Sequence, residues 1–102
     1  MAASFVDHFA GDLVALNAST ATLIHTSGPS AGNNGPEQII VMNRSAAVIT
    51  VGGYDVTDEV NGLILPDGST TPTSTVIPLR FPGIKVYAIA SAGTPNVTVV
   101  RS

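Results

Sequence analysis

The segment that decides the fold reads Glu37-Gln38-Ile39-Ile40-Val41-Met42-Asn43. Its apolar residues are consecutive and mostly β-branched, and a turn-forming triplet, Asn43-Arg44-Ser45, follows at once. A short continuous run of this kind is typical of a strand that is covered on both faces. We therefore predict a central strand over residues 37–43. Its cover is either the opposing sheet together with a neighbouring subunit, or the N-terminal segment.

Outward from this segment, the rest of the chain has the same chemistry. Val, Ile and Thr supply 31 of the 102 residues, and their side chains fit a pleated surface better than a helix. Turn-forming residues recur about every eight to twelve positions, which is the spacing found in sandwiches and barrels. The sequence predicts an all-β chain of about eight strands. The expected fold is a single antiparallel β-sandwich, jelly-roll-like or barrel-like, over residues 12–102, with an N-terminal arm over 1–11.

Local patterns also predict how some strands pair. Residues 12–17 and 20–25 alternate apolar with polar or small side chains, which indicates a first hairpin with one wet face. Residues 84–90 and 96–101 flank a Gly- and Pro-containing turn and are expected to form the last hairpin. Pro78 lies in a strand-like run, and because proline has no N–H to donate, it favours an edge strand.

Two glycine turns carry further expectations. Gly52-Gly53 predicts a turn or bulge before a short strand over residues 54–57, because glycine tolerates positive φ. Pro66-Asp67-Gly68 predicts a turn in which proline presets φ and glycine takes the left-handed position.

Composition limits the classes of function. Four basic and seven acidic residues give a net charge of −3, so a sequence-wide basic footprint for nucleic acid is missing. The chain has no cysteine, which excludes a disulfide framework and a thiolate zinc site. The first ten residues do not read as a secretion signal, and no stretch reaches the roughly 18 apolar residues of a membrane span. We expect synthesis in the cytoplasm and no nucleic-acid or membrane partner.

The low share of charged residues points to self-association. Charged residues make up 11% of the chain, against about 25% in an ordinary soluble domain. Little charge repulsion therefore opposes contact between copies. We expect a homo-oligomer.

The sequence offers weak candidates for a metal site. Oxygen-bearing side chains cluster at Asp55, Asp58, Glu59 and Asn61. Their spacing does not match an EF-hand loop, so a solvated turn is the better interpretation. His8 and His25 are the only imidazoles and have no paired ligand spacing, which favours surface roles for both. No metal ligand is predicted.

Catalytic motifs are missing as well. No Gly-x-Ser-x-Gly turn is present to hold a serine nucleophile. Gly28, Gly32 and Gly35 lack the Gly-Lys-Ser/Thr that binds phosphate and magnesium, so they indicate a flexible hairpin loop. We expect a protein that is not an enzyme, with no catalytic residue and no cofactor.

Three other residue sets favour bland interpretations. The cations are isolated in sequence, at Arg44, Arg80, Lys85 and Arg101. Scattered surface salt bridges explain them better than a binding patch.

The aromatic residues Tyr54, Phe81 and Tyr87 could form a sugar-binding platform, although aromatics on strands more often fill cores or interfaces. Glycosylation sequons occur at Asn17, Asn43 and Asn96, and without a secretion signal we expect no modification.

The N-terminal arm carries the candidate docking residues Phe5, Val6 and Phe9. Phe5 and Phe9 stand four apart and would share one face of a helix, which Val6 and Leu13 would extend. A segment of about ten residues is too short to hold a helix alone in water. We expect the arm to dock on a partner that covers its apolar face. The alternative is that both rings pack on the protein's own sandwich.

The remaining part of the chain carries several motifs in a fixed order. They are Asn43-Arg44-Ser45, Ala46-Ala47-Val48-Ile49-Thr50-Val51-Gly52-Gly53, Asp55-Val56-Thr57, Asn61-Gly62-Leu63-Ile64-Leu65-Pro66-Asp67-Gly68 and Tyr87-Ala88-Ile89-Ala90-Ser91-Ala92-Gly93-Thr94-Pro95-Asn96-Val97-Thr98-Val99. In this order they resemble the small all-β virion proteins of tailed bacteriophages. The resemblance covers roughly residues 37–102, whereas residues 1–36 match the pattern poorly.

The resemblance implies a structural role in a virion. The implied protein is a capsid decoration or cement protein that binds the major capsid protein on the outer head surface and stabilises the capsid. It also implies a homotrimer, because trimers suit the local three-fold positions of an icosahedral shell. Synthesis would take place in the host cytoplasm. The alternatives are a tail or neck structural protein, or a glycan-binding adhesion module.

Overall fold

The computed structural model describes residues 12–28 and 37–101. These residues form no helix, and their strands confirm the all-β prediction. The strands are β1 (Asp12–Ala15), β2 (Thr22–Thr26), β3 (Glu37–Asn43), β4 (Ile49–Gly52), β5 (Leu63–Leu65), β6 (Thr73–Leu79), β7 (Lys85–Ala90) and β8 (Asn96–Arg101).

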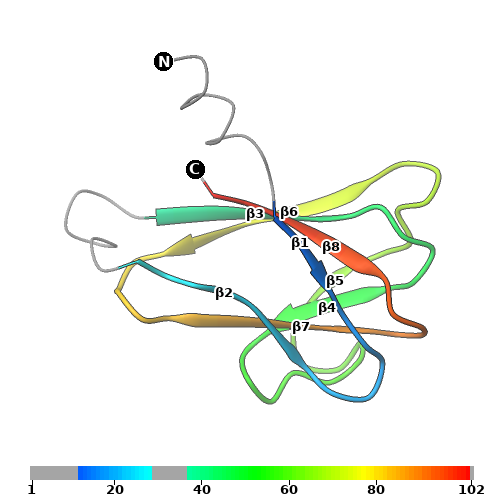
Figure 1. Cartoon of the computed structure of the whole chain (residues 1–102), viewed down its shortest axis with the longest axis horizontal. Coiled ribbons are helices and arrows are strands. Elements are labelled where there is room, and N and C mark those ends of the chain that lie inside the picture. Colours follow the sequence, from blue (N-terminus) through cyan, green and yellow to red (C-terminus); the bar gives the residue numbers. More distant parts are fainter. Residues whose placement is uncertain (1–11, 29–36, 102) are drawn as a thin grey trace.

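The strands form two antiparallel sheets that pack as a sandwich. Sheet A has the order β1-β8-β3-β6, and sheet B has the order β2-β7-β4-β5. Figure 1 shows the two sheets as layers, with β3, β6 and β8 in one and β2, β4 and β7 in the other. The first strand pairs with the last, the second with the seventh, the third with the sixth and the fourth with the fifth. This nested pairing is the topology of a jelly roll, so the predicted fold class is confirmed.

Both predicted terminal hairpins are wrong. β1 and β2 lie in different sheets, and so do β7 and β8. The two connections run beside each other instead, since Leu16 N donates to Pro95 O (2.9 Å) and Ala90 N donates to Asn17 O (3.1 Å). An alternating pattern shows that a strand has one wet face, but it does not say which strand lies beside it.

The core lies between the sheets and is built from the inward residues of both. Its most buried members include Ile39 and Val41 of β3, which have no exposed surface. β3 pairs with β6 on one side and β8 on the other, which confirms the predicted central strand. β6 is at the end of sheet A, so the edge position predicted from Pro78 is confirmed too.

Two local predictions are corrected. Residues 54–57 form part of a loop over 53–62, not a strand, because the loop is closed by side-chain bonds described below. Gly68 is not in the left-handed region; the described glycines with positive φ are Gly83 (76°) and Gly93 (66°). Glycine is required at 68 for space, because an added Cβ would overlap the carbonyl oxygen of Asn43.

Candidate functional site

The predicted docking residues Phe5, Val6 and Phe9, together with His8, lie outside the described residues. Docking of the arm therefore stays a prediction. Gly32 and Gly35 of the glycine-rich segment also lie outside the described residues, and the remaining candidates lie within them.

The acidic cluster belongs to a loop that is closed by its own side chains. Asn61 Oδ1 accepts from Thr57 N (2.7 Å), and Asn61 Nδ2 donates to Asp55 O (3.1 Å). Glu59 adopts a positive φ of 54°. Among residues 12–28 and 37–101, no three His, Cys, Asp or Glu side chains gather as a metal site would require. The amide of Asn61 holds the loop in shape, and one oxygen of the acidic cluster, Asp58 Oδ1, is buried without a hydrogen-bond partner.

This loop, residues 53–62, covers part of the outer face of sheet B. Thr50 and Ile89 are paired in that sheet and alternate with core residues, so they point away from the core, yet both are buried. Thr50 Oγ1 accepts a hydrogen bond from Glu59 N (2.8 Å), and Val56 of the loop is 3% exposed. An added Cβ at Gly62 would overlap the backbone of β4, which shows how closely the loop lies on the sheet.

The outer face of sheet A differs from that of sheet B. Among the described residues, no loop bonds to an outward side chain of sheet A as Glu59 of the loop 53–62 bonds to Thr50. We define this face by the residues that alternate with the core: Leu13, Ala15, Gln38, Ile40, Met42, Ser74, Val76, Pro78, Asn96, Thr98 and Val100. None of them is charged. Leu13 is 69% exposed and Val76 is 54% exposed, while Ile40, Met42 and Val100 are half-buried. The predicted cover of the central strand is thus confirmed on its inner face only.

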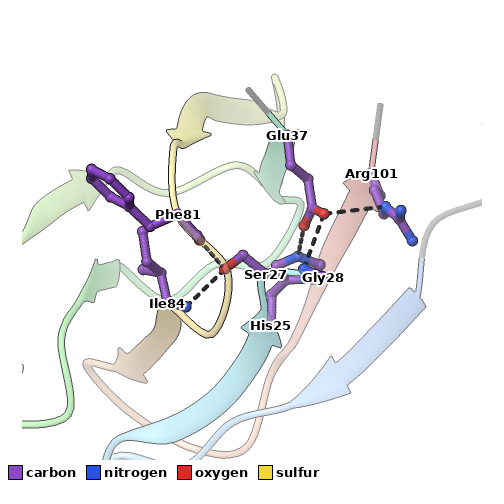
Figure 2. A network of polar contacts seen from close by, with 7 residues as sticks. All are labelled: His25, Ser27, Gly28, Glu37, Phe81, Ile84 and Arg101. Atoms are coloured by element: carbon purple, nitrogen blue, oxygen red, sulfur yellow. Dashed lines mark hydrogen bonds and ion pairs between the residues drawn. The ribbon is translucent and has the colours of Figure 1, made fainter. Parts of the chain in front are cut away.

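A buried carboxylate lies at one end of the sandwich. The side chain of Glu37 on β3 is 6% exposed, and its Oε2 lies 2.6 Å from His25 Nε2 on β2. Its Oε1 accepts from Gly28 N (3.1 Å) and lies 3.7 Å from Arg101 Nε on β8. Figure 2 shows these three groups converging on the carboxylate. Glu37 and Gly28 border residues 29–36, so the carboxylate ties together the two chain segments from which that connection starts and ends.

These contacts change the acidity of Glu37. The hydrogen bond with His25 is the largest effect and lowers the pKa of Glu37 below its usual value, while burial opposes it. The Gly28 amide and the Arg101 charge lower this pKa further. The expected surface role of His25 is wrong, because its side chain is 17% exposed and is bound to Glu37. Sequence reasoning missed Glu37, although an acid at the start of an apolar strand is a signal that it needs partners.

A serine lies beside this pair, but it is not placed as a nucleophile. Ser27 is 5% exposed, and its hydroxyl donates to Phe81 O (2.6 Å) and accepts from Ile84 N (2.7 Å). Figure 2 shows both bonds reaching the turn between β6 and β7. The hydroxyl therefore makes two hydrogen bonds to the backbone, and these stabilise the turn between β6 and β7.

Asn43 is the centre of a second network at the other end of β3. It has no exposed surface, and its Nδ2 donates to Ala47 O (2.9 Å) and Pro66 O (2.9 Å). Its Oδ1 accepts from Ser45 N (2.9 Å) and Ser45 Oγ (2.7 Å). The side chain thus joins the turn after β3 to the end of β5. The sequon at Asn43 is closed to modification in the folded protein, because its amide is buried and bonded.

The remaining candidates are distributed over several elements. Arg80, Lys85 and Arg101 lie near the end of the sandwich that holds Glu37, and Arg44 follows the opposite end of β3, where its Nε lies 3.2 Å from Met42 Sδ. The aromatic residues come from three different elements. Tyr54 is in the loop 53–62 and 80% exposed, Phe81 is in the turn after β6 and 68% exposed, and Tyr87 is half-buried on β7.

The described residues contain no helix long and apolar enough to span a bilayer. Comparisons with protein-family models, with curated proteins and with solved structures give no match to this chain.

Proposed function

We propose that the chain is a structural, non-catalytic subunit of a tailed-bacteriophage virion that decorates and stabilises the outer head. One observation carries the structural role: the use of buried polar side chains. Within the described residues these are Ser27, Glu37, Asn43 and Thr50. Each of them fastens a different connection between strands.

Together, these four buried side chains bond to most of the connections between the strands of the sandwich. Ser27 holds the turn between β6 and β7, and Glu37 holds the chain on both sides of residues 29–36. Asn43 holds the turns after β3 and β5, and Thr50 holds the loop 53–62. An active site keeps polar groups free to converge on a ligand in a pocket. Here Ser27, Asn43 and Thr50 bond backbone groups of the connections between strands, and Glu37 bonds His25 as well as the Gly28 amide. Such use of these buried side chains supports a structural role.

Placement in a virion is supported by the resemblance of residues 37–102 to phage virion proteins and by the low charge. The jelly roll occurs in viral capsid domains and in lectins, so the fold alone does not assign the role. The proposed partners are the major capsid protein and further copies of this chain, in a homotrimer at the local three-fold positions. The proposed location is the outer capsid surface, after synthesis in the host cytoplasm.

Labelling of virions tests this function. Particles produced with an epitope-tagged copy of the chain are expected to bind antibody in a regular array over the head. Label confined to the tail or neck would contradict head decoration and favour a tail protein. Absence of label from purified virions would contradict a virion role altogether.

A reconstitution experiment tests the stabilising role. Heads that lack the protein are heated with and without the purified chain, and DNA release is followed by a fluorescent dye. Saturable binding and a higher release temperature are expected, while heads that already carry their full complement serve as the control and should not change. Binding that an added glycan abolishes would instead favour the adhesion module.

A further inference from the structure

The two outer faces of the sandwich are unequal. On sheet B, Thr50 and Ile89 point outward yet are buried, and Glu59 N of the loop 53–62 donates to Thr50 Oγ1, while the outward Ile64 is 49% exposed. On sheet A the outward residues are uncharged, and they include the exposed side chains of Leu13 and Val76. An antiparallel sheet that faces water normally alternates apolar inward with polar outward residues. The outer face of sheet A also carries the polar residues Gln38, Ser74, Asn96 and Thr98, but Val100, Ile40 and Val76 form an apolar row across it. An apolar row of this kind is typical of a surface that something covers.

The segment directly before β1 has matching chemistry. Residues 1–11 read Met1-Ala2-Ala3-Ser4-Phe5-Val6-Asp7-His8-Phe9-Ala10-Gly11, with two of the three phenylalanines of the chain and a single Asp, Glu, Lys or Arg side chain, that of Asp7. An apolar segment with so little charge fits a face that has none, because neither surface has to leave a charge unpaired on contact.

The attachment point of this segment lies beside the face. Asp12, the first described residue, pairs with Val99, which directly precedes Val100 on the neighbouring strand. Ile40 and Val76 continue that same outward row across β3 and β6. Neighbouring strands are about 4.8 Å apart, so the row extends roughly 14 Å from the start of β1.

The segment is long enough to cross the row in any ordinary conformation. About five extended residues span 14 Å, at roughly 3.3 Å per residue. Eleven helical residues would span about 16 Å. Gly11 permits a sharp reversal at the attachment point, because glycine accepts backbone angles that other residues avoid.

We propose that, in the free subunit, residues 1–11 fold back over the outer face of their own sheet A, with Phe5 and Phe9 against the row of Val100, Ile40 and Val76. The tether decides between this occupant and a second copy. A short tether gives an effective concentration on the order of millimolar, whereas separate copies at micromolar concentration meet far less often. The inference concerns the free subunit and does not depend on the virion role. Any partner that docks on this face has to displace residues 1–11, and this displacement lowers the apparent affinity of the partner for the face.

A single spin label tests the proposal on the full chain. The chain has no cysteine, so Ser4→Cys creates a unique attachment site. With methyl-labelled Ile, Leu and Val, the label is expected to broaden the resonances of Ile40, Val76 and Val100. The methyl resonances of Ile64, on the outer face of sheet B, should remain sharp. The same sample with the label reduced supplies the reference intensities.

Two controls make the outcome decisive. In the Ser4→Cys background, Phe5→Ser together with Phe9→Ser should restore the three resonances while the core methyl shifts stay unchanged. Spin-labelled chains mixed with isotope-labelled chains that carry no spin label report contacts between copies. Broadening only in the mixed sample would overturn the proposal in favour of a neighbour's segment. Broadening that does not distinguish the two outer faces would overturn it outright.

Discussion

Asn43→Ala should be among the most damaging single substitutions in this small domain. The change leaves the carbonyls of Ala47 and Pro66 and the amide of Ser45 without the side-chain partner that each now has at 2.9 Å. A buried polar group left unpaired costs about 1–3 kcal/mol, and we take about 1–1.5 for each because these turns lie near the surface. Three groups give about 3–4.5 kcal/mol. A domain of this size has a total stability of roughly 5–15 kcal/mol.

The matched control is Asn17→Ala. Asn17-Ala18-Ser19 has the same Asn-x-Ser pattern, and Asn17 Oδ1 accepts from Ser19 N (3.1 Å) and Thr20 N (2.7 Å). These bonds are exposed, so water replaces the lost acceptor, and we expect a loss below about 1 kcal/mol. Urea unfolding followed by far-UV circular dichroism compares the two variants at equal m-value. If Asn43→Ala and Asn17→Ala lose the same stability, the assignment of Asn43 as the centre of a buried network is wrong.

Three other perturbations follow from the structure. Folding lowers the pKa of Glu37 from 4.5, so the ionised carboxylate contributes fully to the free energy of unfolding above that pH and loses this contribution as pH falls through the folded pKa. Urea unfolding between about pH 3 and 7 should show this loss of stability, and Glu37→Gln should make the free energy of unfolding depend less on pH. Gly68→Ala should cost several kcal/mol because its Cβ meets backbone, whereas Gly93→Ala, with open space but φ of 66°, should cost about 1–2; equal losses in thermal unfolding would contradict the steric explanation. Thr50→Val removes the acceptor that holds the loop 53–62, and hydrogen exchange of that loop should speed up while the core amides keep their protection.

The sequence predicted the character of individual strands better than it predicted which strands pair with each other. The continuous apolar run identified β3 as a central strand, and Pro78 identified β6 as an edge, because both signals depend on the strand itself. Which strands pair depends on residues far apart in the chain, so the alternation in β1 and β2 suggested a hairpin that the nested topology does not contain.

The polar networks were missed for a related reason. The sequence indicates Asn43 as a turn former, which is correct locally, but its bonds to the end of β5 arise only when the two sheets are assembled. His25 likewise gains Glu37 as a partner across the sandwich, from the next strand in the chain but in the other sheet. The sequence predicts a glycine-dependent turn at Gly68, but the reason differs. Glycine is needed there because a Cβ would overlap the backbone of β3, and not because the residue has a positive φ.

The nested topology determines when the protein can fold during synthesis. β8 lies between β1 and β3 in sheet A, yet it follows all the other described strands in the chain. Until it emerges, one edge of β3 and the whole of β1 have no pairing partner, and such open edges recruit other chains. The β4–β5 pair at the centre of the nest closes the shortest loop, so pairing that spreads outward from it has the smallest entropic barrier at each step. A chain truncated before β8 would therefore keep most of its core residues but have an open sheet, and such fragments should aggregate rather than refold.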